Sequence, residues 1–492
     1  MQQGGNIIAK NGIYAVVAKL YGMAVPIIVL PFVLRTLGVE SYGKVSYVQS
    51  VVAYFILLST LGIQNYAFRE CSTIRDNKKQ LAQKVSQIFT ISVILTVIST
   101  VAFLFYILLV QDARDEYQLN LIYSLSIVGG SLMMDWLYNS LERFDLVSIR
   151  DIIAKTVYLV LCFIFIHRSE DYVIYAFFVV LSQPIIPMVI NFISIRKGLF
   201  GFVPKLMFNN NLHDGFVAVL YLGLMTLGSK LFSSTDTILV KWLTCGNTDE
   251  AVGLYNSGIL IPLVIEQLLF VVASVGSPRL FMYIAKGDEE SAADITNKMS
   301  NIMYFLVVPA VLTCIFFPEE ILTLLGGKEY LKAAHILQIY SLLLFLVVGI
   351  TLAGTRTYIA RKKEKKLFTI LMCMALVNII LDYMFIGLWD IVGAAIATVV
   401  SNILLMTIEL SLEKSWHFVF TRDKIVYLGG AILIAVIFMF SKEYLPVQNI
   451  QVLFISLPIS ALLYALYLRL VREDTIMMSL TVINNYLNNR KK

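Results

Sequence analysis

The chain has 492 residues, of which 58% are hydrophobic and only 15% are charged, and its mean hydropathy is +0.78. A water-soluble domain of this size cannot bury so much apolar surface, so the composition excludes a soluble protein and predicts that most of the surface faces lipid. The net charge of +6 follows from basic residues near helix ends, as described below, so it does not indicate a nucleic-acid partner.

Apolar stretches of about 20 residues, the length that a helix needs to cross a bilayer, recur along the chain with short polar breaks. They are apolar on every side and twice as long as barrel strands, so we predict an all-α polytopic membrane protein with about 14 transmembrane helices. The first helix lacks a cleavage pattern and is expected to stay attached. In chain order the predicted helices are 12–34, 45–65, 85–110, 119–140, 152–167, 172–195, 216–243, 254–275, 299–317, 336–355, 367–389, 391–410, 425–440 and 450–468.

The loops after the first and seventh predicted helices share a short pattern that indicates an internal repeat. The first loop reads LGVESYG and ends at Gly43, and the second reads DEAVGLY and contains Gly253. Aligning the two glycines pairs helices 1–6 with helices 7–12, as in transporters built from two related halves. The predicted parts are an N-lobe at 1–211, a C-lobe at 212–412 with pseudo-symmetry to the first, and two additional helices with a cytoplasmic tail at 413–492.

The basic residues predict the orientation. With the N-terminus inside the cell, 28 of the 39 Lys and Arg residues fall in cytoplasmic segments, as expected for a protein of the bacterial inner membrane. An even number of helices then returns the C-terminus to the cytoplasm. We interpret the densest basic run, Arg361 to Lys366, as a topology determinant rather than as a site for anionic lipid or nucleic acid.

Motifs for catalysis, metals and cofactors are missing from the sequence. The five cysteines and four histidines have no ligand spacing, so neither a metal site nor a disulfide framework is expected. No Asp-x-Asp pair and no GxxxxGK[ST] loop occur, which argues against a glycosyltransferase and against ATP-driven pumping. We therefore predict a transporter rather than an enzyme, with no cofactor, driven by an ion gradient or by substrate flux.

Two lysines are predicted to lie at similar depth in the membrane. Lys19 and Lys230 lie about 20–22 Å from the outer ends of the first and seventh helices. A Lys at the centre of a membrane helix costs about 2.5–3.5 kcal/mol, so it is normally kept where it meets water, a partner or a substrate. Ser233, Ser234 and Thr237 lie on the same helix face as Lys230, which indicates a wet, substrate-binding cavity.

Three acidic residues within predicted helices are candidates for binding a coupling ion. Asp236, Glu266 and Asp382 can each carry a proton, or ligate Na+ when ionised, and Asn378 shares a helix face with Asp382. The alternative is a structural ion pair with a Lys, for instance between Asp236 and Lys230 or Lys241.

Three charged residues are interpreted as structural. Asp135 lies nearer the cytoplasmic end of its helix and is expected to be a satisfied interfacial group. Lys155, like Lys241, lies close to a predicted helix end, from which its ammonium group can reach water.

Three segments of the chain resemble the Wzx-type polysaccharide flippases of the multidrug/oligosaccharidyl-lipid/polysaccharide exporter superfamily. The segments are Pro31–Lys78, which matches the first helical hairpin, Asp135–Ile166, with its Trp136 and Glu142 pattern, and Ser234–Ile261. The resemblance implies a two-lobed, 14-helix transporter that moves a polyprenyl-pyrophosphate-linked oligosaccharide between leaflets, through a cavity lined by basic residues. Lys19 and Lys230 fit that cavity. The implied partners are this lipid-linked substrate, membrane lipid, H+ or Na+, and polysaccharide polymerase machinery.

Two other classes of protein compete with this interpretation. A drug exporter of the same superfamily usually has 12 helices and an acid-dominated cavity. An integral-membrane polysaccharide polymerase usually carries a large outer loop with catalytic Arg or His, whereas the longest outer loop predicted here, from Pro318 to His335, has about 18 residues.

Overall fold

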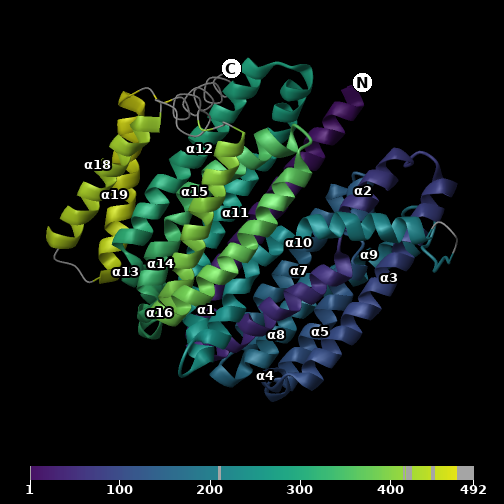
Figure 1. Ribbon diagram of the computed structural model, residues 1–492, viewed down its shortest axis with the longest axis horizontal. Coiled ribbons are helices and arrows are strands. Elements are labelled where there is room, and N and C mark those ends of the chain that lie inside the picture. The colour runs from purple at the N-terminus through teal and green to yellow at the C-terminus, as the bar shows by residue number, and fades with distance from the viewer. Residues whose placement is uncertain are drawn as a thin grey trace. The chain divides into compact units, whose positions relative to one another are not determined.

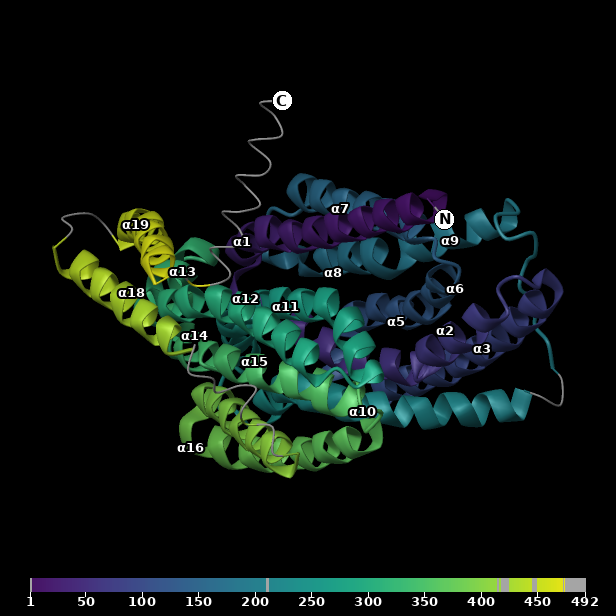
Figure 2. The same ribbon diagram turned by 90° about the horizontal axis from the view of Figure 1, so that it is seen from above.

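The computed structural model describes residues 2–208, 212–413, 416, 424–444, 449–471 and 473, with side chains described except those of 2–17, 224–234 and 449. The chain forms two compact units. The first comprises residues up to Lys241 together with Asn247–Gly253, and the second comprises Trp242–Gly246 and the chain from Leu254. Helices make up nearly all of both units, and no described residue forms a β-strand, which confirms the predicted all-α class (Figures 1 and 2).

In the first unit, α1 packs along α7, α3 and α5, and a buried apolar core joins α2, α3, α6, α9 and α10. Figure 2 shows α1, α7 and α8 running along one another. The elements are α1 (Gln2–Thr60), α2 (Ile63–Thr73), α3 (Lys78–Leu109), α4 (Gln111–Asp115), α5 (Tyr117–Leu132), α6 (Asp135–Ser140), α7 (Phe144–Phe165), the 3-10 turn η1 (Ser169–Asp171), α8 (Tyr172–Val180), the π-helix η2 (Leu181–Ile185), α9 (Ile186–Arg196) and α10 (Leu212–Leu243).

The helix α11 (Thr248–Lys286) begins in the first unit and continues into the second. Within the second unit α16 packs on α14 and α15, and α18 and α19 lie side by side in both views (Figures 1 and 2). The remaining elements are α12 (Glu289–Phe316), α13 (Pro318–Leu325), the 3-10 segment η3 (Lys328–Ala333), α14 (Ala334–Ser341), α15 (Leu343–Ala353), the π-helix η4 (Gly354–Ile359), α16 (Glu364–Leu412), α18 (Ile425–Tyr444) and α19 (Asn449–Leu470).

Two of the longest helices are interrupted by residues with non-helical backbone angles. In α1 the break is Gly38, whose φ of 74° is readily adopted by glycine because it has no Cβ. In α16 the break lies at Trp389 and Asp390, the latter with φ 54° and ψ −140°. The breaks fall where the sequence predicts a polar interruption between consecutive membrane helices, so each of these helices contains two of the predicted segments.

Ten helical stretches of the described chain are long and apolar enough to cross a membrane. One of them runs from Ala18 to Thr73 across the break at Gly38, and another is the whole of α16. The chain is therefore a multi-pass membrane protein, as predicted. The count of 14 crossings stays a prediction.

The two glycines that align the repeat lie against each other within the first unit. A Cβ added at Gly43 would overlap the carbonyl of Asp249, and one added at Gly253 would overlap the carbonyl of Val39. In the alignment Val39 corresponds to Asp249, so the two contacts are equivalent and reciprocal, as at a two-fold axis. Glycine is required at both positions because the backbones of α1 and α11 touch there.

Candidate functional site

Lys155 lies at the middle of α7, and this corrects the expectation that it lies near a helix end. The helix begins at Phe144 and has 22 residues, so Lys155 is about 16 Å from either end. The predicted segment began eight residues later because the charged first turns of α7 hide it from a search for apolar runs. At this depth an ammonium group is too far from both helix ends to reach water easily.

The ammonium group of Lys155 is folded against α1. A Cβ added at Gly22 would overlap its Nζ atom, so the absence of a side chain at Gly22 makes room for the charge. One residue along each helix, Tyr21 and Thr156 are hydrogen-bonded through their hydroxyl groups at 2.7 Å, which fixes α1 against α7 at this level. Lys155 makes no ion pair or hydrogen bond with any described residue.

Lys19 lies one helical turn before Gly22 on α1, so the two positions share a face of the helix. Its side chain is exposed, and like Lys155 it has no acidic partner in the described chain. The first unit thus places two uncompensated ammonium groups from different helices at one level inside an apolar stretch. Such an arrangement can bind a multiply charged anion, because a Lys offers a compact charge with three donors.

The other predicted substrate-binding residues lie on α10. The side chains of Lys230, Ser233 and Ser234 fall outside the described residues. Thr237 and Asp236 are buried, each with 6% of its surface exposed. Nearby, the Tyr54 hydroxyl lies 2.8 Å from that of Thr235, which joins α10 to α1.

A buried polar cluster lies between the two halves of α16 in the second unit. Asn378, Asp382 and Ser401 are fully buried, and the Asn378 amide nitrogen donates to the Ser401 hydroxyl at 3.3 Å. The Asn378 side-chain oxygen has no hydrogen-bond partner among the described residues. Thr398, on the same half of α16 as Ser401, is 4% exposed. Amide, carboxylate and hydroxyl oxygens together form the type of ligand set that a hard cation prefers.

The remaining coupling candidate, Glu266, is half-buried on α11. Within the described ranges no group of three or more His, Cys, Asp or Glu residues could hold a metal ion.

Several other charges are compensated and so are structural. Asp135 accepts two hydrogen bonds from Arg150, whose side chain is only 2% exposed, in agreement with the predicted satisfied group. Lys241 pairs with Asp249 at 2.6 Å, so its acidic partner is on α11 rather than at Asp236. By contrast, Lys155 and Lys19 have no acidic partner among the described residues.

Arg356 is a buried residue that the sequence analysis did not single out. Its guanidinium, 2% exposed, donates to the Ala292 carbonyl and the Thr296 hydroxyl and pairs with Glu289 at 3.3 Å. In the sequence Arg356 is a single Arg that directly follows an apolar run. An Arg that anchors a helix end at the membrane interface has the same pattern, so the sequence does not distinguish the two.

Comparisons with known proteins define the class. A family model described as "Polysaccharide biosynthesis protein" matches residues 8–284, more than half of the chain, and the chain therefore belongs to this family. It is 22% identical over 422 residues to an Escherichia coli K12 protein named "Putative O-antigen transporter", covering 83% of this chain and 97% of that one. It is 24% identical over 403 residues to the Staphylococcus aureus "Capsular polysaccharide biosynthesis protein CapF", and the match covers 80% of this chain and 96% of that protein.

Solved structures share the fold. The lipid II flippase MurJ in an inward closed conformation superposes with a TM-score of 0.73 at 15% identity, covering 94% of this chain and all of that one. A multidrug resistance MATE family transporter in an inward-facing conformation gives a TM-score of 0.61 at 14% identity, and the match covers 81% of this chain and 94% of that one. The chain therefore shares its fold with these two transporters, and the family model together with the named relatives confirms the predicted family.

Proposed function

We propose that this chain is a flippase that moves a polyprenyl-pyrophosphate-linked oligosaccharide from the inner to the outer leaflet of the bacterial cytoplasmic membrane. Membership of the polysaccharide biosynthesis family and the names of its relatives support this function. The N- and C-termini lie in the cytoplasm, and the flipped unit is passed to polysaccharide polymerase machinery. The two lobes alternate access, and the polyprenyl tail stays in lipid.

The pair of uncompensated ammonium groups is the observation that supports this proposal most directly. Lys19 and Lys155 hold positive charge at the middle of an apolar unit without a counter-ion among the described residues, which is costly unless an anion binds. A pyrophosphate carries several negative charges and suits two or more ammonium donors. Lys230 joins them as a third cation, with Ser233, Ser234 and Thr237 as hydrogen-bonding neighbours.

Coupling to an ion gradient uses the buried acids. The oxygens of Asn378, Asp382, Thr398 and Ser401 would hold Na+, which requires oxygen ligands, or Asp382 alone would carry a proton. Burial of the whole cluster supports this role, because a cation bound there is exchanged only when the unit changes conformation. Asp236 and Glu266 are the further candidates.

Transport is tested in a deletion strain. Radiolabelled lipid-linked repeat units should accumulate on the inner leaflet, and the intact gene should restore their export. Accumulation on the outer leaflet would contradict flipping and favour a polymerase.

The head-group role is tested with Lys19→Ala, Lys230→Ala and the double variant at matched protein levels. Because both contact one substrate, their effects should be non-additive, and Lys→Arg should be partly tolerated. Rescue of Lys230→Ala by Asp236→Ala would instead identify a structural ion pair.

The coupling role is tested with Asp236→Asn, Glu266→Gln and Asp382→Asn. The variant that removes the coupling group should transport weakly with or without an imposed Na+ or H+ gradient, while its amount in the membrane is unchanged. Full gradient-driven export by all three variants would reject carboxylate coupling.

A further inference from the structure

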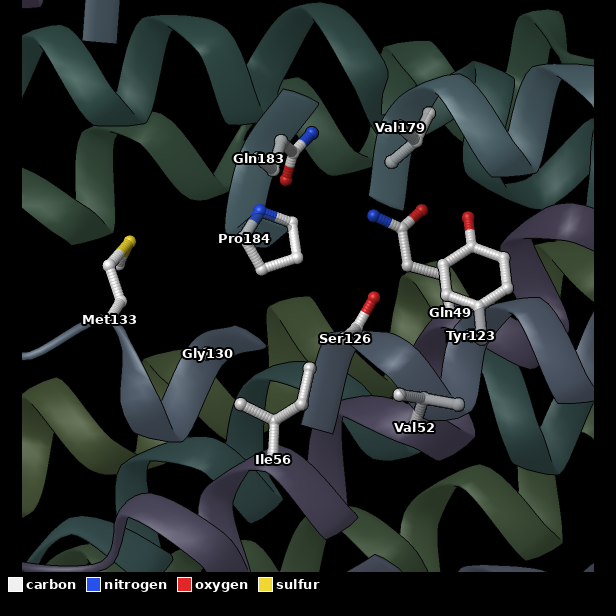
Figure 3. A pocket seen from close by; sticks show the side chains of 10 residues that line it. All are labelled: Gln49, Val52, Ile56, Tyr123, Ser126, Gly130, Met133, Val179, Gln183 and Pro184. Carbon is white, nitrogen blue, oxygen red and sulfur yellow. The ribbon is translucent and has the colours of Figure 1, made fainter. Parts of the chain in front are cut away.

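A cavity of about 180 Å³ lies inside the first unit, between the part of α1 that follows Gly38, the middle of α5, and the junction of α8 with η2. Figure 3 shows this space from close by. At about 30 Å³ per water molecule the cavity holds roughly six waters. Its size therefore suits a small group rather than a whole oligosaccharide.

Four hydrogen-bonding side chains line the cavity, and all are uncharged. They are Gln49, Tyr123, Ser126 and Gln183. Figure 3 shows the amide of Gln49 and the hydroxyl of Ser126 directed into the space, with Gln183 and Pro184 on the opposite wall. The absence of charged lining residues distinguishes this cavity from the lysine pair, and it excludes the pyrophosphate as the favoured ligand.

None of these four side chains makes a hydrogen bond with another described residue. Tyr123 is the most informative, because only 3% of it is exposed and its hydroxyl has no hydrogen-bond partner in the part of the chain that the structure describes. Tyr123 and Ser126 are buried, whereas Gln49 and Gln183 are exposed. A buried polar group without a partner costs free energy, so two buried hydroxyl groups that face this space indicate a ligand or ordered water.

The backbone next to the cavity is not a regular α-helix. Pro184 has no N–H group to donate to the carbonyl four residues earlier, and η2 is a π-helix at this point. Widened turns of this kind often occur at functional sites, and irregular backbone at membrane depth is tolerated where it lines a polar cavity. The π-helix therefore places an irregular stretch of backbone in the same wall.

We propose that this cavity binds one neutral, hydroxyl-bearing sugar ring of the transported lipid. Sugar hydroxyls both donate and accept, which matches two amides, a Ser hydroxyl and a Tyr hydroxyl. The inference rests on the proposed flippase function and adds a separate sugar site to it. The lysine pair then binds the anionic head group, and this cavity selects the cargo by its sugar.

Gly130 allows the cavity to be filled without disturbing its walls. A Cβ added there would meet only Ile56, at 3.4 Å, so a larger side chain extends into the space. By contrast, a Cβ added at the adjacent Gly129 would lie 2.6 Å from Pro184, which makes Gly129 unsuitable. Leu125→Trp adds bulk at an exposed position of the same helix and is the matched control.

The transport test uses proteoliposomes with two probes, a polyprenyl diphosphate bearing one hexose or N-acetylhexosamine and the sugar-free polyprenyl diphosphate. We expect Gly130→Met to slow flipping of the sugar-bearing lipid about tenfold and to leave the sugar-free lipid unchanged. Gln49→Leu and Gln183→Leu each remove an amide that would bond the sugar. Each should slow flipping of the sugar-bearing lipid about 3- to 10-fold. Equal slowing of both probes, or of neither, would overturn the sugar site.

Binding is measured separately with Ser126→Cys in a protein whose native cysteines have been replaced. Methyl hexosides or N-acetylhexosaminides should slow alkylation of the new thiol by N-ethylmaleimide, whereas inorganic pyrophosphate should not. Lipid transport without protection by any sugar would overturn the site and leave the flippase function intact. Protection by a sugar without lipid transport would leave the site standing and remove the proposed function.

Discussion

At the scale of single residues, some Lys and Arg side chains of this protein have an acidic partner and others do not. Lys241 lies near the end of α10 and pairs with Asp249, and Arg150 is held by Asp135, so both are structural. Lys155 has no acidic partner among the described residues, and its ammonium group packs on Gly22. The lack of a counter-charge among the described residues, rather than depth alone, is the reason that we propose a role for Lys155 in substrate binding.

Lys155→Ala should therefore lower surface polysaccharide about tenfold or more at unchanged protein level, since a charge-assisted hydrogen bond contributes about 1.5–3 kcal/mol. Gly22→Ala should have a similar effect, because the added Cβ displaces the ammonium group. Lys197→Ala, at an exposed position, is the control. Wild-type export by both α1 and α7 variants would contradict the assignment.

Glu413 provides a prediction about pH outside the membrane-spanning segments. Hydrogen bonds from Lys363 and Lys366 hold the pKa of its carboxyl group below the usual value. Because the folded-state pKa is lowered, the stabilisation is present above the unfolded-state pKa of about 4.3 and is lost as the pH falls through the folded-state value.

The thermal midpoint of the purified protein should thus fall between about pH 5 and pH 3, and Glu413→Gln should reduce this fall by about 1–2 °C, the small effect expected of surface ion pairs. Glu443→Gln, which alters an exposed acid, is the control. An unchanged pH profile in Glu413→Gln would show that the two lysines do not stabilise the fold through this carboxylate.

At the scale of elements, the first two turns of α11 pack closely on α1. The reciprocal contact of Gly43 with the Asp249 carbonyl, and of Gly253 with the Val39 carbonyl, leaves no room for a side chain on either helix. Polar groups surround it, including Asn247, which donates to Glu40 at 3.2 Å. The glycines are thus explained by backbone contact rather than by a turn.

Gly43→Ala and Gly253→Ala should each destabilise the protein by about 1–3 kcal/mol, the usual cost of overpacking. Both disrupt one contact, so the double variant should be less destabilised than the sum. Thermal unfolding in detergent measures this. Gly387→Ala, where an added Cβ has open space, should leave the midpoint unchanged. Additive effects would mean that the glycines act independently.

At the scale of the whole molecule, ten apolar stretches of the described chain are long enough to cross a membrane, and two of them, in α1 and α16, contain a central break. The count of 14 crossings stays a prediction. The basic cluster after η4 is partly neutralised, because Arg361 pairs with Glu289 and Lys366 with Glu413, each at 2.6 Å. These pairs explain how a dense run of positive charge can remain compact at one end of the second unit.

Cysteine labelling in intact cells tests the orientation. With native cysteines replaced, a cysteine at Lys363 should be shielded from an impermeant thiol reagent, and one at Asp115 should react. Permeabilised cells, in which both should react, provide the control. Labelling of the two positions from the same side would contradict the model with 14 helices.

The sequence by itself determined the class of protein. Membrane helices satisfy their own backbone hydrogen bonds, so an apolar run of about 20 residues is enough to predict one, and the breaks at Gly38 and Asp390 fall where polar residues interrupt those runs. The alignment of Gly43 with Gly253 was also visible, although only the structure showed that these residues touch. Periodicity likewise placed Asn378 and Asp382 on one face.

Only the tertiary structure decided which polar residues lack partners. Whether Lys155 meets an acid, and whether Gln49 and Gln183 face one space, depends on contacts between α1, α7, α5 and η2 that are far apart in the chain. Sequence spacing reports neighbours along one helix, whereas a binding site is formed by side chains from several helices. The pattern of apolar and polar residues along the chain therefore determines where the helices lie in the sequence. The packing of these helices against one another brings the side chains of the site together.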